Sequence, residues 1–325
     1  MKVQVSPKLT NLGTAASQAV EKYFQKILIH EAEVLKDKDP EELHQMRVGM
    51  RRLRSAATGF APVINLPKAA DEQKIGKIAR ILGTLRDLDV MLESLQNKYY
   101  PTLPSQEQEI LDKALLNLLK QRHRALKGVR GILEHKSYQV FKESLQDWLG
   151  NPSYQAIAQL PVEEVLPDLL LPQVSEMFLH PGWLIGVIDR EGGITVREDM
   201  TSASLEQELA ERGEIIHDLR KQAKRVRYLM SLFTEFYGQS YEAYLEDVKG
   251  IQEFLGDIQD SAVLGEFLNT MFDFDLKKRL PNLSELMAQN RFESWQKWQL
   301  LQRRYLTTEI RQNFRSELIR PLVSC

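Results

Sequence analysis

Two rows of basic residues, each led by a histidine, are the part of this sequence whose residue types and spacing could do chemistry. The rows are His44, Arg47, Arg51 and Arg54, and then His217, Arg220, Lys224 and Arg227. Both have the spacing i, i+3, i+7 and i+10, which on a helix falls within an arc of roughly 80° and extends over about 15 Å. A guanidinium group donates two parallel hydrogen bonds to phosphate oxygens, so a row of them suits an anion that repeats along its length.

The rows belong to a longer internal repeat. At an offset of 173 residues, 43–60 aligns with 216–233 and 82–95 aligns with 255–268, both without a gap. The identical pairs include Arg52 with Arg225, Gly83 with Gly256 and Asp87 with Asp260. Two matches at one offset predict a duplicated helical unit.

Few acidic residues accompany the rows. The chain has 43 Lys and Arg against 45 Asp and Glu, a formal charge of -2, so the evidence for an anionic partner comes from the placement of charge and not from its total. The acid-free stretches are 43–70, 113–133, 219–234 and 294–308. Because gathered positive charge repels itself, this segregation favours an anion-binding face over a plain solvated face, which is the alternative reading.

Three motifs resemble the CHAD family, the conserved histidine α-helical domain. They are HxxRVxxRRLR at His44–Arg54, its echo at His217–Arg227, and LGxxRDxDV at Leu82–Val90. The resemblance covers essentially the whole chain. It implies two pseudo-symmetric helical bundles and non-catalytic binding of inorganic polyphosphate in a basic channel or groove between them.

The resemblance also assigns binding residues. In the first repeat they are His44, Arg47, Arg51, Arg52, Arg54 and Arg86, and in the second His217, Arg220, Lys224, Arg225 and Arg227. The second repeat departs from the pattern at Gln259, which aligns with Arg86, at Ala262, which aligns with Asp89, and at Lys221, which aligns with Val48. Its lining is therefore less complete than that of the first repeat.

Other charged residues have supporting roles in this interpretation. We expect Asp87 and Asp260 to orient arginines by ion pairing. Secondary anion contacts are expected from Lys120, Arg122, Arg124, Arg130, Arg303 and Arg304. Only Tyr228, beside Arg227, places an aromatic ring among the row residues, so nucleic acid is an unlikely partner, although a generic polyanion binder is an open alternative.

A metal-dependent enzyme is the competing class. Glu41-x-x-His44 and Glu214-x-x-His217 have the Glu-x-x-His spacing of di-iron bundles, and His217-Asp218 could serve an HD-type hydrolase. The arginines that follow on the same face would repel a dication, so we expect no metal and no cofactor. The ExExK motif of the triphosphatase domain that is often fused to this family is not in the sequence, and the resemblance gives no reason to expect catalysis. The two histidines could also be purely structural.

Apolar periodicity and the placement of proline predict the elements that carry these residues. Helices are expected near 8–37, 41–61, 69–98, 105–135 and 137–149, and again after residue 201. We therefore predict an all-α protein with a first bundle at 1–150, a proline-rich linker at 151–200 and a second bundle at 201–325. A small β-hairpin is expected in the linker, with strands at Leu184–Ile188 and Ile194–Val196.

The composition of the chain indicates the cellular compartment in which we expect the protein. The single cysteine is Cys325, which excludes an internal disulfide framework, and the first residues have no apolar signal region. The most continuous apolar run, Trp183–Ile188, is far shorter than a membrane span. We expect a cytoplasmic protein with no membrane partner.

Overall fold

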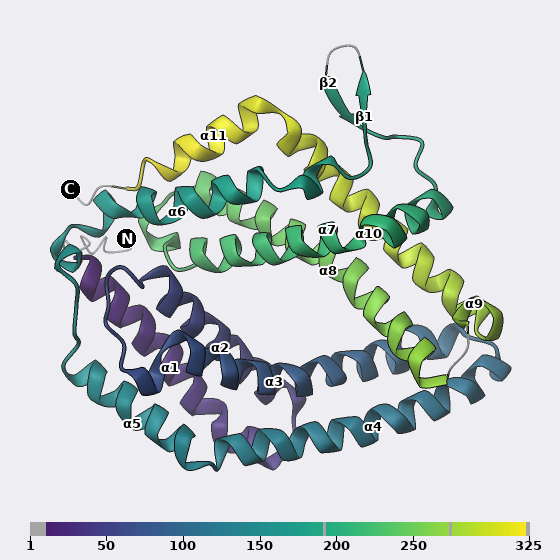
Figure 1. Cartoon of the computed structure of the whole chain (residues 1–325), viewed down its shortest axis with the longest axis horizontal. Coiled ribbons are helices and arrows are strands. Elements are labelled where there is room, and N and C mark those ends of the chain that lie inside the picture. Colours follow the sequence, from purple (N-terminus) through teal and green to yellow (C-terminus); the bar gives the residue numbers. More distant parts are fainter. Residues whose placement is uncertain (1–10, 191–192, 273–274, 323–325) are drawn as a thin grey trace, which may run out of the picture. The chain divides into compact units, whose positions relative to one another are not determined.

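The computed structural model describes residues 11–190, 193–272 and 275–322, and nearly all of its regular structure is α-helical (Figure 1). The first helices are α1 (Leu12–Lys36), α2 (Pro40–Gly59), α3 (Glu72–Glu93), α4 (Ser105–Leu133) and α5 (Lys136–Gly150). They are followed by α6 (Val162–Phe178), α7 (Ser202–Met230), α8 (Gln239–Phe272), α9 (Leu276–Arg279), α10 (Pro281–Leu306) and α11 (Thr308–Leu318). The all-α prediction is confirmed, and the five helices predicted first lie within a few residues of α1 to α5. Residues 8–10 of the first predicted helix lie outside the described residues.

The ends of the row-bearing helices are fixed by their own residues. Asp39 precedes α2 and accepts a hydrogen bond from the Glu41 backbone N–H at 2.8 Å, while Pro40 occupies the first helical position. α7 begins with a capping box, in which Thr201 and Ser204 bond reciprocally. Each row starts after its capped N-terminus and runs towards the C-terminal end of its helix.

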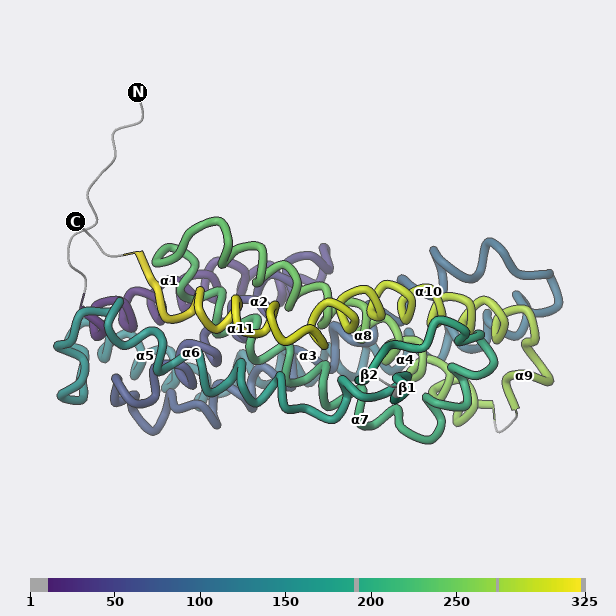
Figure 2. The backbone as a smooth tube through the Cα atoms, turned by 90° about the horizontal axis from the view of Figure 1, so that it is seen from above, coloured from purple at the N-terminus to yellow at the C-terminus, as the bar shows by residue number. Residues whose placement is uncertain are grey.

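The chain divides into two compact units. Among the described residues, unit 1 comprises 11–102 and 109–165, and unit 2 comprises 103–108 and 166–322. In unit 1, α1 packs along α2, and α2 packs on α3. In unit 2, α8 packs against both α7 and α10, and α11 continues from α10 along the same unit (Figure 2). The pair α2 and α3 thus corresponds to the pair α7 and α8, as the aligned repeats predict.

The segment predicted as a linker, 151–200, contains more regular structure than its prolines suggest. Residues up to Val165 belong to unit 1, and those from Leu166 onward belong to unit 2. α6 includes Pro167 and Pro172 within the helix, although proline normally interrupts one. Its buried residues recur at helical spacing at Leu166, Leu170, Val174 and Met177. Burial of that face offsets the backbone hydrogen bonds that the two prolines remove.

The predicted hairpin is present, shifted by a few residues. β1 (Val187–Arg190) pairs antiparallel with β2 (Gly193–Val196), with Val187 opposite Val196. Glu191 and Gly192, which belong to the predicted turn, lie outside the described residues. Gly186 directly precedes β1, and its φ of 70° is a conformation that favours glycine.

Each unit has an apolar core of its own. In unit 1, Phe24 and Ile27 of α1 and Met50 of α2 are fully buried. In unit 2 the core is strongly aromatic, with the buried residues Trp183, Trp295, Trp298, Tyr305 and Phe314. Trp183 and Trp298 lie with ring centroids 4.9 Å apart. Within the described residues, no helix is both long and apolar enough to cross a membrane.

Candidate functional site

The first row lies on α2, about 100° around the helix from the face that it buries. Leu43, Met46, Met50 and Leu53 fill the core side of α2, and this pattern turns the row away from the core. The row side chains are buried to different degrees: that of Arg47 is 19% exposed and that of Arg54 is 51% exposed. The basic row is therefore a half-buried feature of unit 1 and not a set of freely solvated chains.

Arg47 is held between α2 and α3 by two residues of α3. Its guanidinium lies against Gly83, where an added Cβ would be 3.6 Å from Arg47 Nε. One turn later along α3, Asp87 Oδ1 accepts a hydrogen bond from Arg47 Nη2 at 3.2 Å. A glycine and an aspartate four residues apart thus both contact one row arginine.

Unit 2 repeats this arrangement at the aligned positions. Arg220 of α7 lies against Gly256 of α8, where an added Cβ would be 3.2 Å from Arg220 Nε. Asp260 Oδ1 accepts from Arg220 Nη2 at 3.5 Å. The predicted ion pairing of Asp87 and Asp260 with row arginines is present in both units.

Other predicted binding residues also have partners within their own unit. Arg54 pairs with Glu72 at 2.5 Å, and Arg86 lies 4.0 Å from Glu93. Arg227 donates to Gln252 at 3.1 Å and lies 3.9 Å from Glu253. Carboxylates thus accompany the rows, which the sequence around α2 and α7 did not suggest because these acids are on the adjacent helices. The carboxylate side chains are 38% to 65% exposed, and ion pairs with carboxylates this exposed are weak.

Arg52 and Arg225, which the resemblance also assigned to the site, bond next to the rows. Arg52 Nη1 donates to the Tyr23 hydroxyl at 3.4 Å, and its guanidinium carbon lies 5.7 Å from the centre of that ring. Arg225 Nη1 donates to Gln222 Oε1 at 3.2 Å on the same helix. Both arginines are one residue beyond a row position and therefore point about 100° away from that row residue.

The row histidines lie partly buried beside cations, and both have lowered pKa values. Burial lowers the pKa of His44, and the nearby charges of Arg86, Arg51 and Arg47 lower it further, while Glu41 opposes them. Burial also lowers the pKa of His217, with the same effect from Lys221 and Arg220. The pKa of each histidine is therefore lowered by cations of its own row and by one cation beside the row, Arg86 in unit 1 and Lys221 in unit 2.

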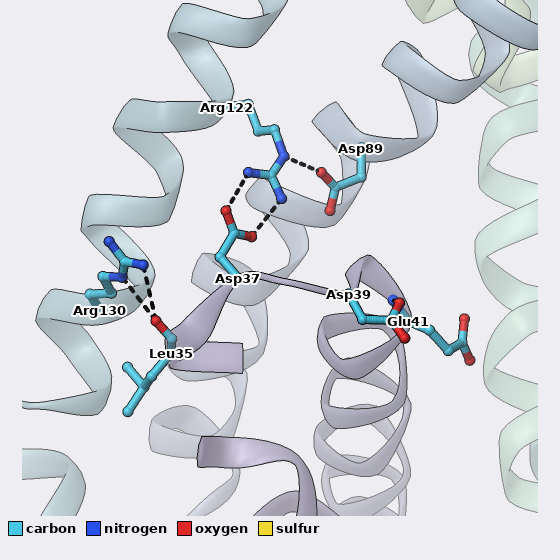
Figure 3. Close-up of polar contacts among 7 residues, drawn as sticks. All are labelled: Leu35, Asp37, Asp39, Glu41, Asp89, Arg122 and Arg130. Carbon is cyan, nitrogen blue, oxygen red and sulfur yellow. Dashed lines mark hydrogen bonds and ion pairs between the residues drawn. The ribbon is translucent and has the colours of Figure 1, made fainter. Parts of the chain in front are cut away.

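Arg122, predicted as a secondary anion contact, is a structural link within unit 1 (Figure 3). Its Nη1 and Nη2 donate to the two oxygens of Asp37 at 2.7 Å and 2.6 Å, and its Nε donates to Asp89 at 2.6 Å. These hydrogen bonds raise the pKa of the Arg122 guanidinium above its ordinary value. Arg130 similarly donates through Nε and Nη2 to the backbone oxygen of Leu35. Both arginines join α4 to the end of α1, and their engaged donors remove them from the set that we propose for ligand binding.

Unit 2 has a comparable link although Ala262 aligns with Asp89. Arg291 of α10 donates to both oxygens of Glu206, at 2.7 Å and 2.6 Å, and to the Ser261 hydroxyl at 2.8 Å. Ser261 thus supplies the contact on α8 that Asp89 supplies on α3. The substitution at Ala262 removes a charge but not the link between helices.

The remaining secondary contacts differ in their surroundings. Lys120 and Arg124 of α4 line a pocket of about 540 Å³ together with Thr84, Asn117 and Gln121. Lys120 and Arg124 are the charged residues among those that line it, and the other lining residues are polar or apolar. Arg303 and Arg304 are instead 3.5 Å from Glu198 and 3.4 Å from Asp247.

The metal-site hypothesis gains no third ligand from the structure. Within the described residues, no three His, Cys, Asp or Glu side chains are grouped so that they could hold a metal ion. Glu41 and His44 are followed on α2 by arginines, and Glu214 and His217 are followed on α7 by Arg220 and Lys221. These cations would repel a metal dication placed beside either histidine.

The fold and the two faces define a class of protein: a duplicated α-helical protein with a histidine-led basic row in each repeat. The CHAD domain family model matches residues 18–269, and the chain belongs to that family. No curated protein sequence matches it.

Two solved structures share the fold. The CHAD domain from the plant Ricinus communis is 23% identical, with a TM-score of 0.54 over 97% of this chain and 94% of that one. PptA from Streptomyces chartreusis is 12% identical, with a TM-score of 0.61 over 90% of this chain and 99% of that one. Identities this low establish a common helical fold and leave function to the residues of the site.

Proposed function

We propose that this chain binds inorganic polyphosphate through the basic rows of its two units and does not turn it over. The observation that carries the proposal is the duplicated placement of Arg47 and Arg220, each set between a glycine and an aspartate on the adjacent helix. A fixed guanidinium loses little conformational entropy when it binds, and its paired donors fit phosphate oxygens. Membership of the CHAD family supports polyphosphate as the repeating anion.

The ligand set in this proposal keeps most of the residues expected from the sequence. The primary contacts are His44, Arg47, Arg51, Arg54 and Arg86 in unit 1 and His217, Arg220, Lys224 and Arg227 in unit 2. Arg52 and Arg225 contribute positive charge from beside the rows. Lys120 and Arg124 extend the site over α4. A single chain of phosphates that engages both rows, in a channel or groove between the repeats, is the finer form of the proposal, in a cytoplasmic protein without a cofactor.

A charge-reversal experiment tests which residues bind. Arg51→Glu combined with Lys224→Glu should abolish measurable polyphosphate binding while the helical circular dichroism signal is kept, because each row gains an internal negative charge. Lys136→Glu with Lys278→Glu is the matched control, since it makes the same charge change once in each unit at exposed positions away from the rows. Equal losses in both double variants would mean that binding depends only on net charge.

A competition experiment tests which polymer binds. Immobilised long-chain polyphosphate should retain the protein at about 0.15 M salt, where exposed charges are screened beyond about 8 Å. Single-stranded and double-stranded DNA should retain much less, because the rows offer almost no aromatic surface for bases. Equal retention on all three polymers would reduce the proposal to a generic polyanion binder. A change in polyphosphate chain length after incubation, with or without added Mg²⁺ or Mn²⁺, would show that the protein is an enzyme.

A further inference from the structure

The rows are accompanied by two short patterns on the adjacent helices, Gly83 with Asp87 on α3 and Gly256 with Asp260 on α8. In both, the glycine and the aspartate are four residues apart, so they lie on one helix face, one turn from each other. The arginine that each pair contacts is 40 residues before the aspartate in both units. Both the contacts and their spacing have been kept in two repeats that differ at most other positions.

We propose that these two glycine and aspartate pairs position Arg47 and Arg220 for binding polyphosphate, an inference that rests on the proposed function. The absence of a side chain at the glycine lets the arginine lie against the helix backbone. The aspartate then holds Nη2 from one side and fixes the rotation of the guanidinium plane. Nε faces the glycine and is buried in Arg220, so the donors left for other acceptors are the Nη N–H groups that the aspartate does not use. The row arginine then meets the phosphate without having to be ordered first.

The aspartates oppose the ligand electrostatically, and this makes the proposal testable by the sign of an effect. A carboxylate within hydrogen-bond distance of a row arginine repels a polyanion that binds to the same arginine. If the carboxylates had no positioning role, Asp→Asn would remove that repulsion and raise the affinity. If they position the arginines, Asp→Asn weakens the hold on Nη2 and lowers the affinity in spite of the more favourable charge.

The glycines provide a second test, graded by distance. A Cβ at position 256 would meet Arg220 Nε at 3.2 Å, which is closer than ordinary contact, whereas at position 83 it would meet Arg47 Nε at 3.6 Å, an ordinary contact. Alanine should therefore displace Arg220 more than Arg47. Both changes also replace a glycine inside a helix, which by itself raises helix stability by up to about 1 kcal/mol. Reduced binding in a protein with unchanged or raised thermal stability would separate positioning from folding.

The experiment measures the affinity for long-chain polyphosphate by isothermal titration calorimetry, together with the thermal unfolding temperature. Asp87→Asn with Asp260→Asn should bind about three- to tenfold more weakly than the wild type, because one charge-assisted hydrogen bond is weakened in each unit. Gly256→Ala should lower the affinity more than Gly83→Ala, and neither should lower the unfolding temperature. Asp147→Asn with Asp168→Asn, at exposed positions away from the rows, controls for the loss of two negative charges.

The outcomes separate the two proposals. An unchanged or raised affinity in Asp87→Asn with Asp260→Asn, or equal affinities for the two glycine variants, would overturn the positioning role while leaving polyphosphate binding intact. A wild-type protein that fails to bind polyphosphate would overturn the proposed function itself.

Discussion

At the scale of the residue, the row histidines couple binding to protons. His44 and His217 have lowered pKa values because they are partly buried beside cations, so the free protein holds them mostly neutral at pH 7. A bound polyanion would reverse that environment and raise both pKa values. Binding is then accompanied by proton uptake, and the affinity should increase as the pH falls from 8 towards 6.

This proton coupling can be measured directly. Calorimetry at pH 6.5 in buffers of different ionisation enthalpy should show net proton uptake when polyphosphate binds. His44→Ala with His217→Ala should remove most of the uptake and flatten the pH dependence between pH 6 and 8. An unaltered pH profile in the double variant would make the histidines structural.

The same histidines should make the free protein less stable as the pH falls, whereas its affinity for polyphosphate increases. A histidine whose pKa is lower in the folded state than in the unfolded chain contributes fully above its ordinary pKa, and that contribution is lost as the pH falls through the folded value. Mild acid therefore weakens the free fold while it strengthens binding. Thermal unfolding with and without polyphosphate, followed from pH 7.5 to 5.5, should show ligand stabilisation that grows towards low pH.

Asp37 and Asp89 share Arg122, but they should respond differently to amidation. Asp37 receives two guanidinium bonds, so Asp37→Asn places an amide N–H against a donor and should lower the free energy of unfolding by about 1.5–3 kcal/mol. Asp89 is 7% exposed, receives one bond through Oδ1, and has a buried Oδ2 with no hydrogen-bond partner within the described residues. Burial is the main cause that raises its pKa. Asp89→Asn keeps the Oδ1 acceptor and should stay within about 1 kcal/mol of the wild type.

The pH dependence separates these two variants further. A carboxyl group with a raised folded-state pKa contributes most below its ordinary pKa and loses that contribution as the pH rises through the folded value. The free energy of unfolding of Asp89→Asn should therefore be closest to that of the wild type at neutral pH, and it should fall further below the wild-type value near pH 4. Urea unfolding at both pH values measures this difference, and a large loss at neutral pH would mean that the Asp89 charge is required by Arg122.

At the scale of the element, α10 is capped by a residue that lies 175 positions earlier in the sequence. Its N-terminus follows Leu280, which has no side-chain acceptor to cap it. Glu107, 5% exposed, accepts from the Asn282 backbone and side-chain N–H groups at 3.0 and 2.8 Å through Oε1, and from the Leu283 N–H at 3.0 Å through Oε2. The first turn of α4 thereby supplies the cap of a helix in unit 2.

Removal of that carboxylate should destabilise unit 2. Glu107→Ala leaves three donors without their acceptor and should lower the free energy of unfolding by about 2–4 kcal/mol. Glu107→Gln should cost less, because one oxygen remains. Glu109→Gln, at an exposed position on the same helix, is the control and should unfold like the wild type in urea. Equal unfolding midpoints for all three variants would show that α10 does not need this cap.

The sequence predicted elements better than it predicted the contacts between them. Helical periodicity located α1 to α5 because each helix buries a face within its own unit. It missed α6, whose buried stripe was masked by Pro167 and Pro172. The Glu107 cap and the Arg122 link join residues that are 175 and 85 positions apart, and no local pattern marks them. The glycines beside the row arginines were visible as matched positions in the repeat, yet only the packed helices show what they contact.

At the scale of the whole molecule, the duplication has produced two similar but unequal faces. Unit 1 has Arg86 and Asp89 where unit 2 has Gln259 and Ala262, while the arrangement around Arg47 and Arg220 is common to both. The first face has Arg86 near its histidine, whereas the added cation of the second face, Lys221, is paired with Asp218 on its own helix. Single-row variants should show a larger loss from unit 1 than from unit 2.

Chain length should reveal whether the two faces act on one ligand. If a single phosphate chain engages both rows, the second contact is intramolecular and long chains should bind at least about a hundredfold more tightly than tripolyphosphate. Arg51→Glu alone should then bring the affinity for long chains down towards that for tripolyphosphate, which a single row can hold. Calorimetric stoichiometry checks the same point, because tripolyphosphate should approach two per protein and a long chain one or fewer. An affinity per site that does not change with length would mean that the repeats bind separately, and that the duplication added a second site without linking it to the first.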